Sequence, residues 1–281
     1  MYDAASQSDV VRHQRAVGEL RVSVRARDGA TVLDNLRQAG CMKARFPRAH
    51  AAGWLDVVGL NTSGGVAGGD RLGAAYDVAA GAQASFSAQA AERFYRALPG
   101  SVPAHVRTTI RVAAGAHAEW LPQETILYDG SALDRSLDIE LDATARFLGI
   151  ETLVFGRDLM GERVHQARLM DRIRIRRNGR WLLHDAVRME GAVDGMLARP
   201  AVAKGARVVA TLFCIAPDAE AQLDAARDVL SAHDVDAGAS AWDGMLLARM
   251  VGANSALVRK AAIGLLDILR DGRPLPRVWL C

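Results

Sequence analysis

The feature that most constrains the fold is a long series of short apolar or alternating runs, most of them followed by a turn residue. Alternation with a period of two is typical of β-strands, and dipeptides such as Asp28-Gly29 and Asn178-Gly179 favour turns between strands. The expected strands lie at 20–26, 31–36, 54–60, 72–78, 105–112, 116–121, 137–141, 145–155, 163–176, 181–189 and 206–215. This regular spacing predicts a mainly β fold. We expect one domain over residues 1–281, with a polar and flexible start at 1–15.

Two segments within 217–272 break the strand pattern and favour helices. Residues 218–233 place apolar side chains on one stripe, and Asn254 and Ser255 offer caps for a second helix that Gly272 and Pro274 end. The second helix has a broad apolar face that includes Leu265, Leu266 and Leu269. Such a face must be covered, and both the β body and a partner protein are possible covers.

Composition excludes several classes of protein. Half of the residues are apolar and the net charge is only +3, with no polybasic block, which argues against nucleic-acid binding. The three cysteines are far apart and form no CxxC pair, as is typical of a reducing compartment. No secretory signal is visible, and the longest apolar run is too short to span a bilayer. These observations predict a soluble cytoplasmic protein with no membrane contact.

The segment 60–70 combines two glycine pairs with a closing carboxylate, Asp70. Two pairs this close predict a tightly folded loop, because glycine adopts backbone angles that other residues avoid. The loop has neither the GxxxxGK[ST] pattern nor a GxGxxG that opens a helix, so a phosphate site is not indicated. A structural turn and a ligand loop both remain possible.

Three further segments place acids and arginines beside glycines or prolines at strand ends. They are 87–96, 121–129 and 155–162, and a fourth short pattern, 275–279, closes the chain. The seven histidines form no HxH or HExxH pair, and no GxSxG elbow is present. No nucleophile with an adjacent base stands out, so recognition or ion handling is favoured over bond-breaking chemistry.

Taken together, these segments resemble the UreD (also called UreH) family of urease accessory proteins over most of the chain, from Leu20 to Trp279. Segment 61–70 is similar to the family's xTxGGxxGGD pattern, 87–96 to TTQAxxKxYR, 121–129 to LPxxxIxF and 156–162 to GRxxxGE. The residues that carry the resemblance are Gly64, Gly65, Gly68, Gly69, Gln89, Tyr95, Arg96, Gly156, Arg157 and Gly161. Arg93 stands in place of the family's usual lysine, and Glu124 in place of a common proline.

The resemblance implies an elongated β-helix-like body with a small C-terminal helical part. It also implies a scaffold that is not an enzyme and that binds no cofactor tightly. Members of the family bind UreF, which recruits the GTPase UreG, and the assembly docks on apo-urease. Nickel then passes to the urease active site, and two UreD chains are joined through a UreF dimer.

Two hypotheses about individual residues follow. Transient Ni²⁺ would be guided by weakly binding carboxylates, and the candidates are Asp70, Glu124, Glu151, Glu162 and Asp185, with Arg157 paired to one of them. UreF would be contacted by the C-terminal part, through Leu265, Leu266, Leu269 and Trp279. For the carboxylates, ordinary strand-end acids are the alternative. For the whole protein, the alternative is a small hydrolase or transferase that uses the glycine loop as a ligand cradle.

Overall fold

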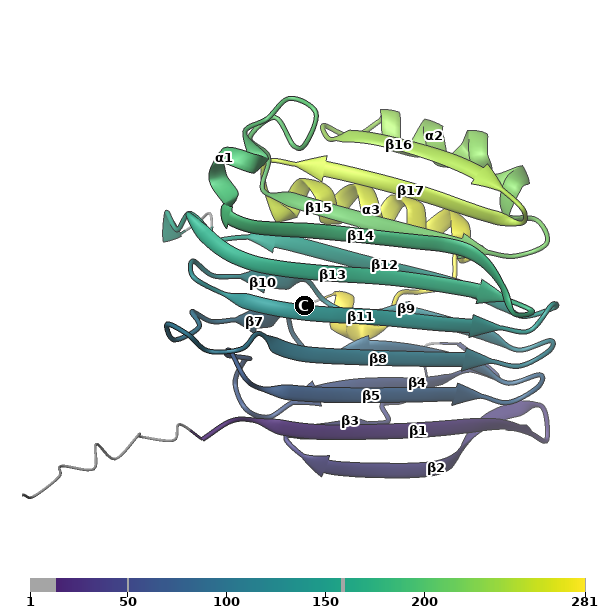
Figure 1. Ribbon diagram of the computed structural model, residues 1–281. Coiled ribbons are helices and arrows are strands. Elements are labelled where there is room, and N and C mark those ends of the chain that lie inside the picture. The colour runs from purple at the N-terminus through teal and green to yellow at the C-terminus, as the bar shows by residue number, and fades with distance from the viewer. Residues whose placement is uncertain (1–13, 50, 158–159, 281) are drawn as a thin grey trace, which may run out of the picture.

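The computed structural model describes residues 14–49, 51–157 and 160–280, and shows two β-sheets and a layer of helices (Figure 1). Of the flexible start expected for residues 1–15, residues 1–13 lie outside the described residues. Sheet A has seven strands, in the spatial order β14 (Arg180–Ala192), β13 (Gln166–Arg177), β11 (Ala132–Leu141), β8 (Ala104–Val112), β5 (Arg71–Val78), β1 (Val17–Arg27) and β2 (Ala30–Gly40). The mainly β prediction is confirmed.

Sheet B lies behind sheet A in Figure 1. Its main path runs through β16 (Asp236–Trp242), β17 (Met245–Gly252), β15 (Val208–Ile215), β12 (Arg146–Phe155), β9 (His117–Leu121), β6 (Gln83–Ala88), β4 (Leu55–Asn61) and β3 (Met42–Arg45). Two short strands, β7 (Glu92–Phe94) and β10 (Thr125–Leu127), pair in parallel with each other, and β10 also pairs with β12.

From β4 to β13 the chain alternates between the two sheets, apart from the short β7 and β10. Like strands therefore stack in parallel: β5, β8, β11 and β13 in sheet A, and β4, β6, β9 and β12 in sheet B. This is a β-helix-like arrangement of stacked coils. The loops that connect a strand of sheet B to the next strand of sheet A therefore stack as well, and they all lie at one end of the body.

Those passages span 61–71, 88–104, 121–132 and 155–166, and we call this end of the molecule the motif end. They contain all four of the segments that carry the family resemblance. The patterns are far apart in sequence, and the coil topology alone brings them to the same end.

Two apolar layers hold the three layers of structure together. One lies between the sheets and includes Leu20, Ile110 and Phe147; the other lies between sheet B and the helices. The helical segments are α1 (Val193–Leu197), η2 (Ala219–Gln222), α2 (Leu223–Ser231), α3 (Ser255–Leu269) and η3 (Arg277–Trp279). Asn254 caps α3 as expected, because its Oδ1 accepts a hydrogen bond from the Leu257 amide at 3.1 Å.

A buried ion pair joins the helical layer to sheet B. The Arg270 Nε and Nη2 atoms, just after α3, donate to the two oxygens of Glu119 on β9 at 3.0 and 3.2 Å. Arg273 adds a third contact to Glu119 at 2.7 Å. The side chains of Glu119 and Arg270 are fully buried. Burial opposes ionisation, yet the two guanidiniums hold the pKa of Glu119 below its ordinary value.

The expected strand list omitted the short strands β3, β7 and β10 and two longer stretches. Residues 83–88 form an interior strand of sheet B, although Gln83, Ser85 and Ser87 interrupt the apolar pattern. Residues 236–252 form the hairpin β16–β17, whose first strand is largely exposed and rich in small residues. The helix expected at 218–233 is divided into η2 and α2.

Candidate functional site

The motif end brings the four segments into direct contact. The Tyr95 hydroxyl donates to the Gly64 carbonyl at 3.0 Å, and the Tyr95 ring meets the Tyr128 ring edge-on at 5.0 Å. The Arg157 guanidinium lies over the Tyr128 ring at 4.4 Å, and its Nε donates to Glu162 at 2.7 Å. These contacts form a chain that links all four segments. The predicted pairing of Arg157 with one of the candidate carboxylates is confirmed.

Asp70 fixes the glycine loop from inside. Its carboxylate is buried and accepts from the amides of Ala67 at 2.7 Å and Ala16 at 2.8 Å. Gly65 has a φ of 142°, and a Cβ atom there would lie 2.3 Å from Cε2 of Tyr95. The loop therefore needs glycine at this position for both backbone and space. Asp70 thus holds the backbone of the loop in place, and this structural role explains why a carboxylate closes the glycine-rich pattern.

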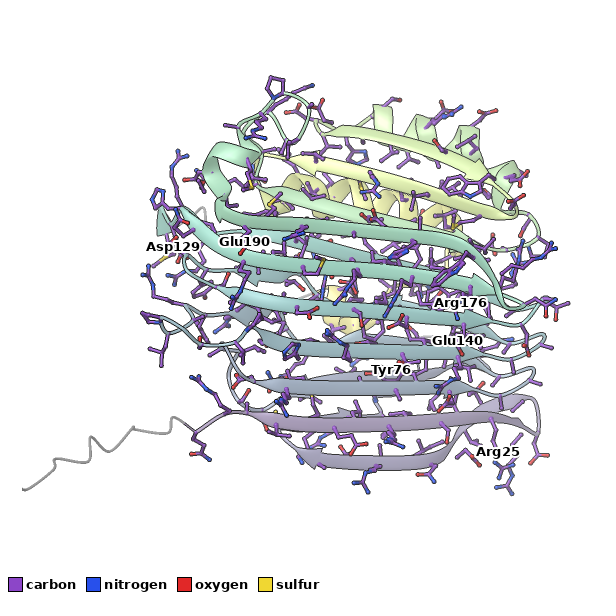
Figure 2. All side chains as sticks on the ribbon, in the orientation of Figure 1. Arg25, Tyr76, Asp129, Glu140, Arg176 and Glu190 are labelled. Carbon is purple, nitrogen blue, oxygen red and sulfur yellow. The ribbon has the colours of Figure 1, made fainter. Side chains whose placement is uncertain are left out.

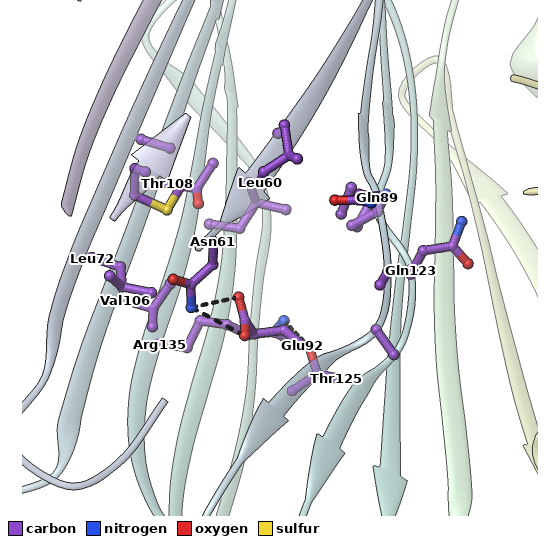
Figure 3. Close-up of a pocket in the computed structure, with 18 of the residues that line it drawn as sticks. Leu60, Asn61, Leu72, Gln89, Glu92, Val106, Thr108, Gln123, Thr125 and Arg135 are labelled. Atoms are coloured by element: carbon purple, nitrogen blue, oxygen red, sulfur yellow. Dashed lines mark hydrogen bonds between the residues drawn. The ribbon is translucent and has the colours of Figure 1, made fainter. Parts of the chain in front are cut away.

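A cavity of about 260 Å³ lies between the sheets beside the motif end (Figure 3). Much of its wall is apolar, and Gly64 and Gly65 of the glycine loop contribute to it. The polar side chains that line it include Asn61, Gln89, Gln123, Thr125, Glu92, Arg135 and Glu151. The glycine loop and segments 87–96 and 121–129 thus share one cavity.

Glu92 lies in this cavity and is not among the predicted carboxylates. Its two oxygens accept from the Asn61 side-chain amide, each at 3.3 Å, as Figure 3 shows. Burial raises the pKa of Glu92, although the bond from Asn61 acts in the opposite direction. The signal in the sequence is its position inside segment 87–96, one of the four segments that carry the family resemblance.

Glu151 stands deeper, where it belongs to a buried charge network. It accepts from Arg135 Nη1 at 2.7 Å and from the Trp120 indole at 2.7 Å. Arg135 also forms a two-pronged ion pair with Asp171, at 2.8 and 2.6 Å. Burial raises the pKa of Glu151, against the influence of Arg135. One guanidinium thus faces two carboxylates, which leaves the network short of positive charge.

Arg135 and Asp171 could have been found from sequence. Arg135 lies between Leu133 and Leu137 at an inward position of β11, and Asp171 lies between Leu169 and Ile173 on β13. A charge at an inward position of an alternating strand must find a partner inside, because an unpaired buried charge is costly.

A second, very small cavity continues from the same network. Its volume is about 20 Å³, enough for one water molecule, and it is lined by Glu151, Asp171, Asp185 and Thr211 among others. Asp185 on β14 pairs with Arg249 of β17 at 2.7 Å, and Arg249 is nearly half exposed. Glu151 lines both cavities. Glu92, Glu151 and Asp185 thus line two cavities that share Glu151.

The five predicted carboxylates do not form one group. Glu151 and Asp185 line the small cavity together, whereas Asp70 holds the glycine loop and Glu162 pairs with Arg157 at the motif end. Glu124 pairs with Arg259 of α3 at 3.0 Å. Among the described residues, no group of three His, Cys, Asp or Glu side chains is arranged to hold a metal ion. Their role in an ion route stays a prediction.

The side chains predicted to contact UreF lie inside the chain's own core. Leu265 and Leu266 of α3 are fully buried against sheet B, and Trp279 donates from its indole to the Leu121 carbonyl at 3.0 Å. Leu269 is partly buried in the same layer. The β body covers the broad face of α3, so direct contact of these buried side chains with a partner would require the helix to leave the sheet.

The lining of the larger cavity contains no histidine or cysteine among the residues that the structure describes. Ser87 lines this cavity without an imidazole beside it among the lining residues, and the hydrolase or transferase alternative stays a prediction. No helix in the described ranges is long and apolar enough to cross a membrane.

Comparison with known proteins matches the whole described body. The sequence profile of the family described as UreD urease accessory protein matches residues 16–280. Urease accessory protein UreD 3 of Bradyrhizobium sp. is 40% identical over 277 residues, covering 99% of this chain and 98% of its own length. The UreD proteins of Dinoroseobacter shibae and Ruegeria pomeroyi are 44% and 46% identical, over 95% and 89% of this chain and 93% and 95% of their own lengths.

Proposed function

Because the chain belongs to the UreD family of urease accessory proteins, we propose that it acts as a scaffold in nickel insertion into apo-urease. In this proposal it is not an enzyme and works in the cytoplasm. It assembles with UreF, and through UreF with the GTPase UreG, in a complex that holds two copies of the chain. Ni²⁺ is its cargo and passes through its interior.

The observation that carries the proposal is the set of inward-facing carboxylates that line the two cavities beside the motif end. Glu92 lines the larger cavity, Glu151 lines both, and Asp185 lines the smaller one. Buried acids cost several kcal/mol, roughly, unless they are paired, and a purely structural core would be served as well by apolar residues. Their place beside the cavities favours a role in handling a cation.

The chemistry of these groups fits transfer better than storage. Oxygen ligands hold Ni²⁺ less tightly than a cage of thiolates or imidazoles, so the ion can leave again. Burial raises the pKa values of Glu92 and Glu151, so protons compete with the ion for both carboxylates. Arg135 would balance the charge of the network when no cation is present.

The test is urease activation by a variant with Glu92→Gln and Glu151→Gln, co-expressed with urease, UreF and UreG. We expect the nickel content and the activity of urease to fall at least about tenfold, while affinity capture still recovers the complex. Asp34→Asn with Asp224→Asn is the matched control, since both carboxylates are exposed and neither lines the two cavities. Full activation by the variant of Glu92 and Glu151 would refute the carboxylate route, and failure of the wild-type chain to capture UreF or urease would refute the scaffold itself.

A further inference from the structure

The outer face of sheet A carries an excess of arginine that the ion route does not use. Strand register places the outward side chains of β8, β11, β13 and β14 in rows across the sheet. The seven arginines there are Arg107, Arg111, Arg168, Arg172, Arg174, Arg176 and Arg188, and the four carboxylates are Asp134, Asp138, Glu140 and Glu190. The excess of three equals the net charge of the whole chain, +3. We call this surface the arginine face.

Part of this charge is already compensated. Asp134 pairs with Arg107 at 3.0 Å and with Arg172, and Asp138 pairs with Arg174 at 2.5 Å. These pairs lie in the middle of the sheet and orient the arginines along it. In contrast, Arg176 forms no ion pair with a carboxylate of the described residues; its guanidinium lies instead 3.8 Å above the Trp181 ring. Figure 2 shows Arg176 and Glu140 on the face that is turned to the viewer.

Trp181 gives the arginine face an aromatic anchor. It is 52% exposed, and its ring stacks on His184 with a centroid distance of 5.7 Å and an interplanar angle of 17°. The ring thus contacts both Arg176 and His184 on the hairpin β13–β14. Tryptophan and arginine are the residue types that most often dominate the binding energy of protein interfaces.

From this arrangement we propose that the arginine face docks a carboxylate-rich segment of a partner protein, with Trp181 and Arg176 as its anchor beside the β13–β14 turn. Guanidinium groups bind carboxylates through two parallel hydrogen bonds, and the excess charge complements an acidic partner. The four carboxylates interspersed on the face would repel the continuous charge of a nucleic-acid backbone. The proposal is independent of the ion route, which lies between the sheets.

The experiment measures the anisotropy of a short fluorescein-labelled peptide of alternating glutamate and serine, titrated with the full chain at physiological ionic strength. The test variant carries Arg176→Gln and Trp181→Ala. The matched control carries Arg37→Gln and Leu33→Ala on β2, which removes one arginine and one exposed apolar side chain elsewhere. We expect the test variant to bind the peptide about tenfold more weakly, as for loss of an anchoring pair, and the control to bind like the wild type.

Three results would overturn the proposal: no binding by the wild-type chain, equal loss in the test and control variants, or single-stranded DNA binding as tightly through the same two residues. Thermal unfolding of each variant checks the fold. If the double variant is unfolded, Arg176→Gln alone replaces it, because it removes the anchoring guanidinium and leaves the Trp181 ring in place. The same weakening is then expected, and unchanged binding overturns the proposal.

Discussion

The ion pair between Glu119 and Arg270 allows a quantitative test of how the helical layer is attached. In Glu119→Gln the shape of the side chain is kept, but the fully buried Arg270 loses its ion pair with Glu119. Removing one partner of a buried pair costs about 3–5 kcal/mol, since an uncompensated charge stays inside. With a total stability of about 5–15 kcal/mol for a typical domain, this is a large fraction.

The assay is urea unfolding followed by tryptophan fluorescence, which is sensitive here because Trp279 packs in the same layer as α3. The control is Glu140→Gln, which breaks the exposed pair with Arg111 at 3.5 Å and should cost less than about 1 kcal/mol. A loss below about 1 kcal/mol in Glu119→Gln would refute the reasoning, because it would mean that Arg270 finds solvent or another partner at little cost.

The same pair predicts a pH dependence with a definite sign. The folded pKa of Glu119 is held below its unfolded value of 4.5, so its contribution to stability is present above that pH. It is lost as the pH falls through the lower, folded pKa. Glu119→Gln should therefore reduce the acid sensitivity of the chain in this range, besides lowering its stability at neutral pH.

Two further predictions concern packing beside this layer. Burial lowers the pKa of His117 to about 4 from 6.5, so the folded state binds this proton only at a lower pH than the unfolded chain does. The free energy of unfolding should therefore fall by about 3 kcal/mol as the pH falls from 6.5 to 4. His117→Asn should remove that part of the pH dependence of urea unfolding. Gly149→Ala would place a Cβ atom 2.2 Å from Cε2 of Phe213, so calorimetry should show a loss of about 1–3 kcal/mol, and an unchanged melting temperature would contradict the close packing of Gly149 against the Phe213 ring.

Strands with clear alternation or continuous apolar runs were predictable, and so was the α3 cap at Asn254, because local chemistry decides them. The strand 83–88 could not be predicted in this way, because side chains on both of its faces are buried. Its serines therefore do not mark a solvent-facing side, and the alternation of apolar and polar residues that indicates a strand is missing. The broad apolar face of α3 predicted that something must cover it, but did not show whether the β body or a partner protein does so. That choice depends on the distant strands β15 and β17, whose positions no local pattern reveals.

The four segments of the candidate site could be predicted from the sequence, but the side chains that line its cavities could not. Each of the four segments stands out in the sequence, yet their meeting at one end follows from the stacking of coils and not from any spacing between them. Proximity to glycines favours acids that hold loops, such as Asp70 and Glu162. Glu92 and Asp171 are inside for a different reason: they occupy inward positions where the coil closes around the cavities.

The network of Glu151, Arg135 and Asp171 differs from ordinary core structure because two buried carboxylates share a single guanidinium. Glu119 and Arg270 form a closed arrangement, in which two guanidiniums and two carbonyls satisfy the charges, and it serves to attach a helix. Glu151 and Asp171 share a single guanidinium, and burial raises the pKa of Glu151 and so opposes its ionisation. A network that needs one more positive charge, set between two cavities, is better suited to a passing cation than to stability. The two networks should therefore respond differently to conversion into amides: Glu119→Gln destabilises the fold, whereas Glu151→Gln keeps the fold and loses the transfer.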